Sequence, residues 1–192
     1  MRAQSVRKGQ IISVSGRPGS GKSTLCAAIA NELACSVIQY DAYEGFTRHG
    51  PEFIQDWLSR GAPYAEIHTY DLRRDLDDLA HDGPVIFDTP LGRAHPDTGP
   101  VIDISIWIEC PADVALKRKI DQLRQGVPAG EEAAFELWLT GFLSAQDAIV
   151  EPACAVQRER VSPLADLIVD GRKSSSECLA ISLTEIRNLS VS

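Results

Sequence analysis

Residues 16–24 of the chain read Gly-Arg-Pro-Gly-Ser-Gly-Lys-Ser-Thr and match the pattern G-x-x-x-x-G-K-[ST]. An alternating, apolar-rich run at residues 10–15 precedes the match, and residues 22–33 follow it with apolar side chains at helical spacing. A glycine-rich turn between a strand and a helix is the setting in which this pattern binds phosphate groups. The match therefore indicates an α/β architecture with an anion site after its first strand.

Each part of this phosphate loop, residues 16–24, has a chemical reason. Its glycines allow backbone conformations that turn successive N–H groups inward, and the following helix adds partial positive charge at its N-terminus. Lys22 can reach the β- and γ-phosphates of a nucleoside triphosphate, and the Ser23 hydroxyl can ligate Mg²⁺. We therefore predict ATP and Mg²⁺ as ligands. The predicted nucleotide-binding residues are Gly16, Gly19, Ser20, Gly21, Lys22, Ser23 and Thr24.

Strands alternate with helices along the whole chain. The runs at 84–88 and 102–109 are nearly continuous and apolar, which is typical of strands buried on both faces of a parallel sheet. We predict one domain over residues 1–192, with a three-layer α/β/α P-loop kinase fold and a five-stranded parallel sheet. The expected strands are 10–15, 36–40, 84–88, 102–109 and 165–169; the expected helices are 22–33, 51–60, 71–81, one beginning at Pro111, 131–149 and 175–189, with an ambiguous piece between Pro152 and Pro163.

Composition excludes several classes of partner. The chain has 192 residues, a net charge of −8 and a pI of about 5.0, whereas general nucleic-acid binders are normally basic. It contains no run of about 18 apolar residues that could span a membrane. Its five cysteines are scattered, without a C-x-x-C pair, as expected of reduced thiols. We expect a cytoplasmic protein that binds neither nucleic acid nor membrane, and we leave open whether it forms a homodimer.

Two aspartates stand where predicted strands end. Asp41 follows the second strand and Asp88 ends the third, so both should face the phosphate loop, because ligands of parallel sheets bind at the carboxyl ends of the strands. Phosphoryl transfer to a hydroxyl needs a residue that accepts its proton and a carboxylate near the metal. We predict Asp41 for the first role and Asp88, with Ser23, for the second. The alternative is that both are turn or capping residues.

Basic residues follow the fourth predicted strand. Arg118 and Arg124 lie on or just after the helix that begins at Pro111, before a break rich in Gly and Pro. We predict a lid at about residues 117–131, with Arg118 neutralising the transferring phosphoryl group and Arg124 near the substrate. A solvated basic face is the alternative.

Arg93 and His95 follow Asp88 in the next loop. We predict that they contact the acceptor, because we place this loop at the same end of the sheet. Simple solvation of both side chains is the alternative.

With these residues in view, the chain resembles the uridine kinase-like branch of P-loop kinases, which includes phosphoribulokinase and type I pantothenate kinase. The likeness rests on the phosphate loop, on residues 39–43, where an aspartate at the strand end is followed by aromatics, on residues 102–119, and on residues 150–152 with 164–169. The resemblance implies that Asp41 is the catalytic base, that Arg118 is a lid arginine that contacts phosphate, and that Tyr43 lies near the substrate. It also implies that Asp88 replaces the family's acidic residue at the end of the third strand.

The sequence departs from this family in its acceptor region. Only about 42 residues separate Asp41 from Pro84, so the hairpin that grips the base in uridine kinases is missing. We predict an ATP- and Mg²⁺-dependent kinase acting on a hydroxyl of a small molecule, with a nucleoside as the first choice of acceptor. The alternatives are a kinase of another metabolite or of an antibiotic, a nucleoside-monophosphate kinase, and a nucleotide-binding module without catalysis.

Overall fold

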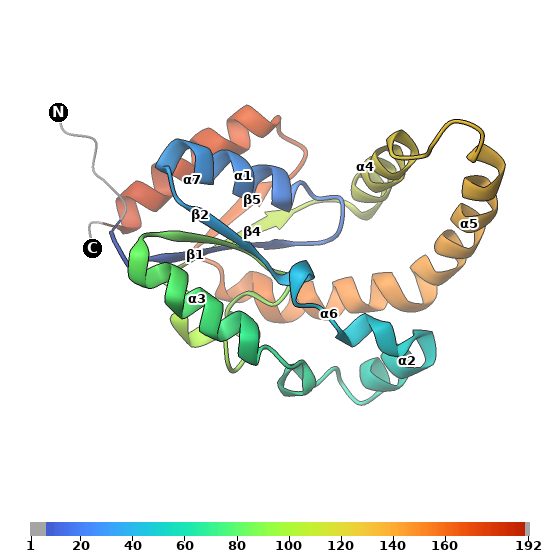
Figure 1. Cartoon of the computed structure of the whole chain (residues 1–192), viewed down its shortest axis with the longest axis horizontal. Coiled ribbons are helices and arrows are strands. Elements are labelled where there is room, and N and C mark those ends of the chain that lie inside the picture. The colour runs from blue at the N-terminus through green and yellow to red at the C-terminus, as the bar shows by residue number, and fades with distance from the viewer. Residues whose placement is uncertain (1–6, 191–192) are drawn as a thin grey trace.

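The computed structural model describes residues 7–190 and has at its centre a parallel five-stranded sheet in the order β2-β3-β1-β4-β5 (Figure 1). Because every neighbouring pair is parallel, the carboxyl ends of all the strands lie at one edge. The register pairs Val14 of β1 with Asp88 of β3, so Asp88 lies beside the loop that follows β1. The strands are β1 Ile11–Gly16, β2 Ser36–Gln39, β3 Val85–Asp88, β4 Ile104–Glu109 and β5 Leu167–Asp170.

Helices cover both faces of the sheet and complete the three layers (Figure 1). Helices α1 and α7 pack on one face, while α3 and the end of α6 pack on the other. The predicted α/β/α fold with a five-stranded parallel sheet is thereby confirmed. The helices are α1 Lys22–Leu33, α2 Pro51–Ser59, α3 Tyr70–Asp82, α4 Ala112–Gln125, α5 Glu132–Ala145, α6 Glu151–Val161 and α7 Ser175–Leu189.

Side chains of β1 alternate between the two faces of the sheet and contribute to a hydrophobic core on each face. Ile12 and Val14 pack against α1 and α7, whereas Ile11 points into the core shared with α3. On that second face Ser13 is buried and its hydroxyl donates a hydrogen bond to Ser105 Oγ of β4 at 3.1 Å. Because β1 is the central strand and is buried on both sides, the phosphate loop begins from the core of the sheet.

Helix α5 continues into α6 instead of ending near residue 149 as predicted. A π-helical turn at Gln146–Val150 joins the two helices, and no loop intervenes. Pro152, which we expected to bound a separate piece, lies in the first turn of α6. Proline lacks an N–H donor and its ring clashes with the preceding turn of a regular α-helix. The wider π turn relieves this conflict, so the chain passes Pro152 without a break.

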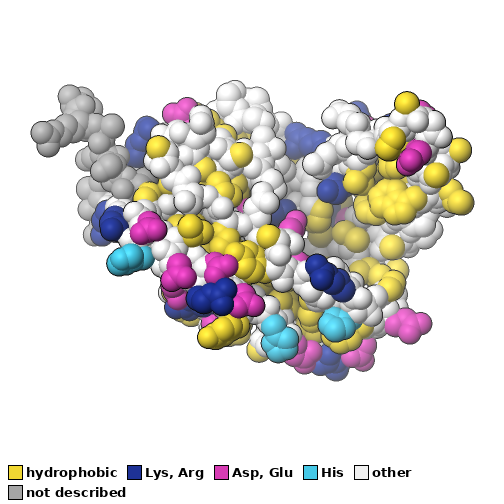
Figure 2. Space-filling view, in the orientation of Figure 1, with side chains coloured by type: hydrophobic (Ala, Val, Ile, Leu, Met, Phe, Trp, Pro, Cys, Tyr) yellow, Lys and Arg dark blue, Asp and Glu magenta, His cyan; other side chains and the backbone are white. Residues whose placement is uncertain are grey.

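Helices α4 and α5 form a hairpin that projects from the body of the molecule (Figure 1). Residues 126–131 join them, within the segment predicted to form a lid. Apolar side chains gather on this hairpin, and Leu137 and Trp138 are exposed (Figure 2). Among residues 7–190, no helix has the length and apolar composition that crossing a membrane requires.

Candidate functional site

The phosphate loop depends on glycine for close packing. Gly16, Gly19 and Gly21 have φ angles of 149°, 78° and 98°, in the region that side chains disfavour. A Cβ at Gly19 would lie 2.1 Å from the carbonyl oxygen of Ala115 in α4, and one at Gly16 would lie 2.8 Å from the carbonyl oxygen of Ile108. The loop is therefore packed against β4 and α4 at positions where only glycine fits.

Lys22 begins α1 and folds back over the loop. Its Nζ donates to the Arg17 carbonyl oxygen at 3.3 Å. Burial lowers the pKa of Lys22, and the nearby carboxylates of Asp88 and Asp41 oppose this by raising it. A triphosphate bound on the loop would act in the same direction as these carboxylates, because its negative charge also favours the charged form of Lys22.

Ser23 and Asp88 form an oxygen pair beside Lys22. The Ser23 hydroxyl donates to Asp88 Oδ2 at 2.6 Å, and the Asp88 side chain is buried. Hydroxyl and carboxylate oxygens suit Mg²⁺, which normally keeps several water and phosphate oxygens as further ligands. Residues 7–190 contain no group of three or more His, Cys, Asp or Glu side chains that could hold a metal. The pair thus fits a nucleotide-bound Mg²⁺ and does not form a metal site built from protein ligands alone.

A cavity of about 1060 Å³ opens over the phosphate loop. It lies at the hollow between the body and the α4–α5 hairpin (Figure 2). One side consists of the loop, Asp88 and two basic residues of α4, Arg118 and Lys119. The other side carries Asp41, in the 3₁₀ turn Tyr40–Ala42 directly after β2. A triphosphate on the loop and a hydroxyl compound beside Asp41 would share this one space.

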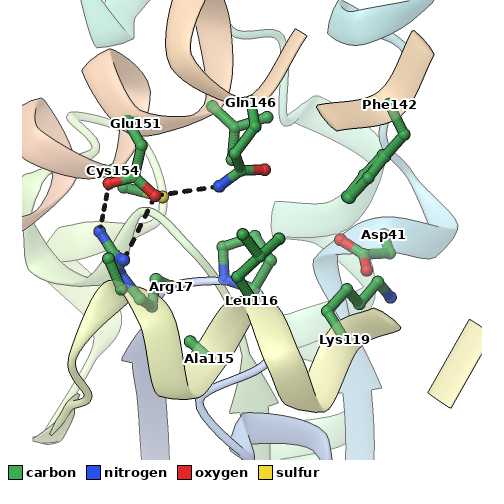
Figure 3. A pocket seen from close by; sticks show the side chains of 12 residues that line it. Arg17, Asp41, Ala115, Leu116, Lys119, Phe142, Gln146, Glu151 and Cys154 are labelled. Carbon is green, nitrogen blue, oxygen red and sulfur yellow. Dashed lines mark hydrogen bonds and ion pairs between the residues drawn. The ribbon is translucent and has the colours of Figure 1, made fainter. Parts of the chain in front are cut away.

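Lys119 is a lining residue that the sequence analysis missed. It lines the main cavity together with Arg118 and Asp41. Lys119 and Asp41 also line an adjoining cavity of about 310 Å³, which lies between α4, the end of α5 and the start of α6 (Figure 3). Helical spacing places Lys119 on the same face as Ala115 and Leu116, but only the structure shows that this face lines a cavity.

Arg17 and Glu151 connect the phosphate loop to the start of α6 (Figure 3). Arg17 Nη2 lies 2.9 Å from Glu151 Oε2, and Nη1 donates to Oε1 at 3.3 Å. Gln146, the first residue of the π turn, donates from Nε2 to the same Oε1 at 2.9 Å. No sequence signal pairs Arg17 with a residue 134 positions away, so this contact is visible only in the structure.

Arg118 also borders a second side of the loop. Its Nη1 donates to the Gly171 carbonyl oxygen at 2.7 Å. It lines a cavity of about 270 Å³ that contains Ser20 and Thr24 of the phosphate loop and the segment at residues 173–175. Arg118 therefore stands between the main cavity and this smaller one.

The structure corrects the roles expected of Arg93 and His95. Arg93 forms an ion pair with Asp166 at 2.7 Å and donates to backbone carbonyls at the start of β4, at the amino edge of the sheet. His95 is buried; its Nδ1 accepts two backbone N–H groups and its Nε2 donates to the Ile67 carbonyl oxygen at 2.9 Å. Both side chains hold the loop after β3 in place, and neither lines the main cavity. The structure therefore does not support the predicted contact of Arg93 and His95 with the acceptor.

Tyr43 and Arg124 also lie outside the main cavity. The Tyr43 hydroxyl donates to Asp75 Oδ2 of α3 at 2.7 Å, and this bond is the first cause of a raised Tyr43 pKa. Arg124 forms an exposed ion pair with Glu136 of α5 at 3.1 Å, within the hairpin. Both side chains therefore contact other parts of the protein, and the structure does not place them at the predicted substrate site.

Comparison with solved structures identifies the fold. A gluconokinase from Sinorhizobium meliloti 1021 is 22% identical and covers 96% of this chain and 95% of its own, with a TM-score of 0.55. A sugar kinase from Janibacter sp. HTCC2649 is 19% identical over 91% and 92%, with a TM-score of 0.52. Deoxyadenosine kinase from M. mycoides is 12% identical over 93% and 100%, with a TM-score of 0.54. No protein-family model and no curated protein sequence matches the chain. The structural likenesses show that the chain has the P-loop kinase fold.

Proposed function

We propose that the chain is an ATP- and Mg²⁺-dependent kinase that transfers the γ-phosphoryl group to a hydroxyl of a small molecule. One observation carries this proposal: the Ser23–Asp88 pair stands beside Lys22 on one side of a cavity whose other side presents Asp41. A nucleotide-binding module would need the loop but would not need a second carboxylate across the cavity. The fold, shared with a gluconokinase and a deoxyadenosine kinase, supports the same function.

The residues divide the reaction between them. Backbone N–H groups of the phosphate loop and the Lys22 ammonium hold and neutralise the phosphates. Mg²⁺, when bound at Ser23 and Asp88, supplies further positive charge to the phosphate oxygens. Asp41 orients the acceptor hydroxyl and takes its proton as the oxygen attacks the γ-phosphorus, while the bond from that phosphorus to the β–γ bridging oxygen breaks and ADP leaves. Arg118 lies close enough to the loop to contact the transferring group when the α4–α5 hairpin closes as a lid.

The acceptor is proposed to be a nucleoside, as in the uridine kinase-like group that the motifs resemble. The space beside Asp41 is part of a cavity of about 1060 Å³, which is large enough for a triphosphate and a small acceptor together. The proteins of similar fold include a gluconokinase, a sugar kinase and a deoxyadenosine kinase. The smaller cavity between Arg118 and residues 173–175 is our proposed position for the base of ATP.

A screen with radiolabelled ATP tests the proposal. Nucleosides, sugars, sugar alcohols and pantothenate are offered in turn, and labelled product is separated from ATP and free phosphate. The parent protein should label at least one acceptor, whereas Lys22→Ala should label none and retain a normal melting temperature. Lys8→Ala, which removes an exposed lysine outside the cavity, serves as the matched control. Equal transfer by Lys22→Ala and the parent would refute the assignment of the site.

A further inference from the structure

The adjoining cavity of about 310 Å³ continues the main cavity beside Asp41. Five residues line both spaces: Pro18, Asp41, Lys119, Val150 and Cys154. Asp41 therefore stands at the junction, and a molecule whose hydroxyl is bound there can extend into the adjoining cavity. Small-molecule sites have volumes of about 300–1,000 Å³, so this cavity lies at the lower end of the range and suits one ring-sized group.

Two helices supply apolar walls to the adjoining cavity. Ala115 and Leu116 follow Ala112 by three and four residues, so all three lie on one face of α4. Phe142 of α5 lies across the cavity from Leu116 (Figure 3). The Phe142 ring stacks on Trp138 at a centroid distance of 5.2 Å, and Trp138 does not line the cavity. One side of the Phe142 ring is thus supported by protein, while another is presented to the cavity.

Charged side chains around the adjoining cavity are paired or lie at its junction with the main cavity. Arg17 and Glu151 bind each other through two contacts, at 2.9 and 3.3 Å. Asp41 and Lys119 have opposite charges and lie near one another at the junction (Figure 3). Away from the junction, the lining side chains within residues 7–190 offer apolar surface and no unpaired charge.

Gln146, the first residue of the π turn, supplies one oriented hydrogen-bond acceptor. It is only 8% exposed, and its Nε2 donates to Glu151 Oε1 at 2.9 Å. Since an ionised carboxylate only accepts hydrogen bonds, this contact fixes the amide group with Nε2 toward Glu151. Gln146 Oε1 then points the other way, toward the space that Phe142 borders (Figure 3), and no described residue donates to it. A largely buried oxygen without a donor favours a ligand that supplies one.

We infer that the adjoining cavity binds a flat, uncharged ring of the acceptor, which packs between Phe142 and Leu116 and donates an N–H or O–H to Gln146 Oε1. The reactive hydroxyl of the same molecule then lies at Asp41. This inference rests on the proposed kinase function and makes Phe142 and Gln146 residues that determine its specificity. For a nucleoside acceptor, the base occupies the adjoining cavity and the sugar lies at the junction.

Acceptors that differ only in the ring test the inference. The nucleoside that is labelled best in the screen is compared with the methyl glycoside of its sugar, which lacks the base. It is also compared with an analogue whose base donor is methylated, such as 3-methyluridine for uridine. Transfer is measured as kcat/KM, and acceptor affinity is measured by calorimetry with a non-hydrolysable ATP analogue and Mg²⁺ present. The nucleoside should exceed the glycoside by about 10- to 100-fold, through burial of the ring, and the methylated analogue by about tenfold, through the donor.

Two substitutions locate the ring. Phe142→Ala removes the aromatic wall and should lower kcat/KM for the nucleoside by about tenfold, while the value for the glycoside stays unchanged. Gln146→Leu removes the acceptor oxygen and should lower the preference for the nucleoside over its methylated analogue by about tenfold. Phe135→Ala is the matched control, because Phe135 stacks on Trp138 in the same helix and lines neither cavity. Phe142→Leu and Gln146→Met replace any variant that does not fold, and ATP affinity should equal that of the parent throughout.

The outcomes separate the two proposals. A glycoside that is phosphorylated as efficiently as the nucleoside overturns the ring site and leaves the kinase function standing. An equal loss for nucleoside and glycoside in Phe142→Ala also overturns it, because the residue would then act only on the hairpin as a whole. Unchanged discrimination against the methylated analogue in Gln146→Leu overturns the contact with Gln146. Absence of transfer to every acceptor, with ATP binding intact, refutes the kinase function, and the ring site falls with it.

Discussion

Replacing Asp88 by Asn removes one negative charge from the site and preserves the shape of the side chain. In the parent, the Ser23 hydroxyl donates to Asp88 at 2.6 Å, and the carboxylate is only 8% exposed, so solvent screens the interaction weakly. A hydrogen bond to a charged partner contributes about 1.5–3 kcal/mol, compared with about 0.5–1.5 kcal/mol for a neutral one. Loss of a residue that holds or orients a metal ligand typically costs about 10–100-fold in metal affinity. We therefore expect the half-saturating Mg²⁺ concentration to rise by about 10–100-fold.

The same substitution changes the pH dependence through Lys22. Burial lowers the pKa of Lys22, and Asp88 is the largest of the charges that raise it again. Removing that charge lowers the Lys22 pKa further. Because Lys22 is charged only below its pKa, the variant loses the ammonium at a lower pH than the parent does. The alkaline limb of kcat/KM for ATP, which reports groups of the free enzyme, should move to lower pH.

Two measurements check this reasoning. Initial rates are recorded against Mg²⁺ concentration at fixed ATP and against pH at saturating Mg²⁺, and calorimetry measures ATP affinity with and without Mg²⁺. Asp82→Asn, an exposed aspartate at the end of α3, is the matched control and should behave as the parent. An unchanged Mg²⁺ requirement together with an unchanged alkaline limb would refute both the metal role of Asp88 and its coupling to Lys22.

Three further substitutions have distinct expected outcomes. Asp41→Asn should reduce transfer by about 100-fold or more while ATP affinity measured by calorimetry stays constant, since a positioned base acts on the acceptor alone; loss of ATP binding would make Asp41 a nucleotide residue. Arg118→Ala should lower kcat/KM for ATP by about 10–100-fold, and a value within twofold of the parent would leave the residue with only its bond to Gly171. Glu151→Gln breaks a partly exposed ion pair with Arg17, so the melting temperature should fall by no more than about 4 °C; a larger fall in calorimetry would show that the pair stabilises the fold more than its exposure suggests.

Local signals carried the prediction of the sheet and of the phosphate loop. The loop lies between a buried strand and a helix, so its pattern could be interpreted without knowledge of distant contacts. The strand at residues 84–88 was expected because its apolar run is continuous, and β3 is indeed buried along its length. Strand order was not predicted, yet it decides that β3 is the neighbour of β1 and that Asp88 meets Ser23.

Positions of loop side chains could not be predicted in the same way. Arg93 follows Asp88 by five residues, but the chain turns back along the sheet, and the guanidinium reaches the start of β4 and Asp166. A backbone carbonyl or a single carboxylate has no pattern that marks it as the partner of a given arginine. The pairing of Arg17 with Glu151 was missed for the same reason, and the π turn before Pro152 was missed because proline normally ends a helix.

These long-range contacts connect the phosphate loop to α4, the first helix of the projecting hairpin, and to α6, which follows the second. On one side, the loop packs so closely against α4 that Gly19 leaves no room for a side chain beside the Ala115 carbonyl. On the other side, Arg17 binds the first residue of α6, Glu151, next to the π turn that continues from α5. A movement of the hairpin toward the cavity must therefore either carry the loop with it or break the Arg17–Glu151 pair. Since Arg17 lies within the loop that would hold the phosphates, lid closure and nucleotide binding would act on the same ion pair.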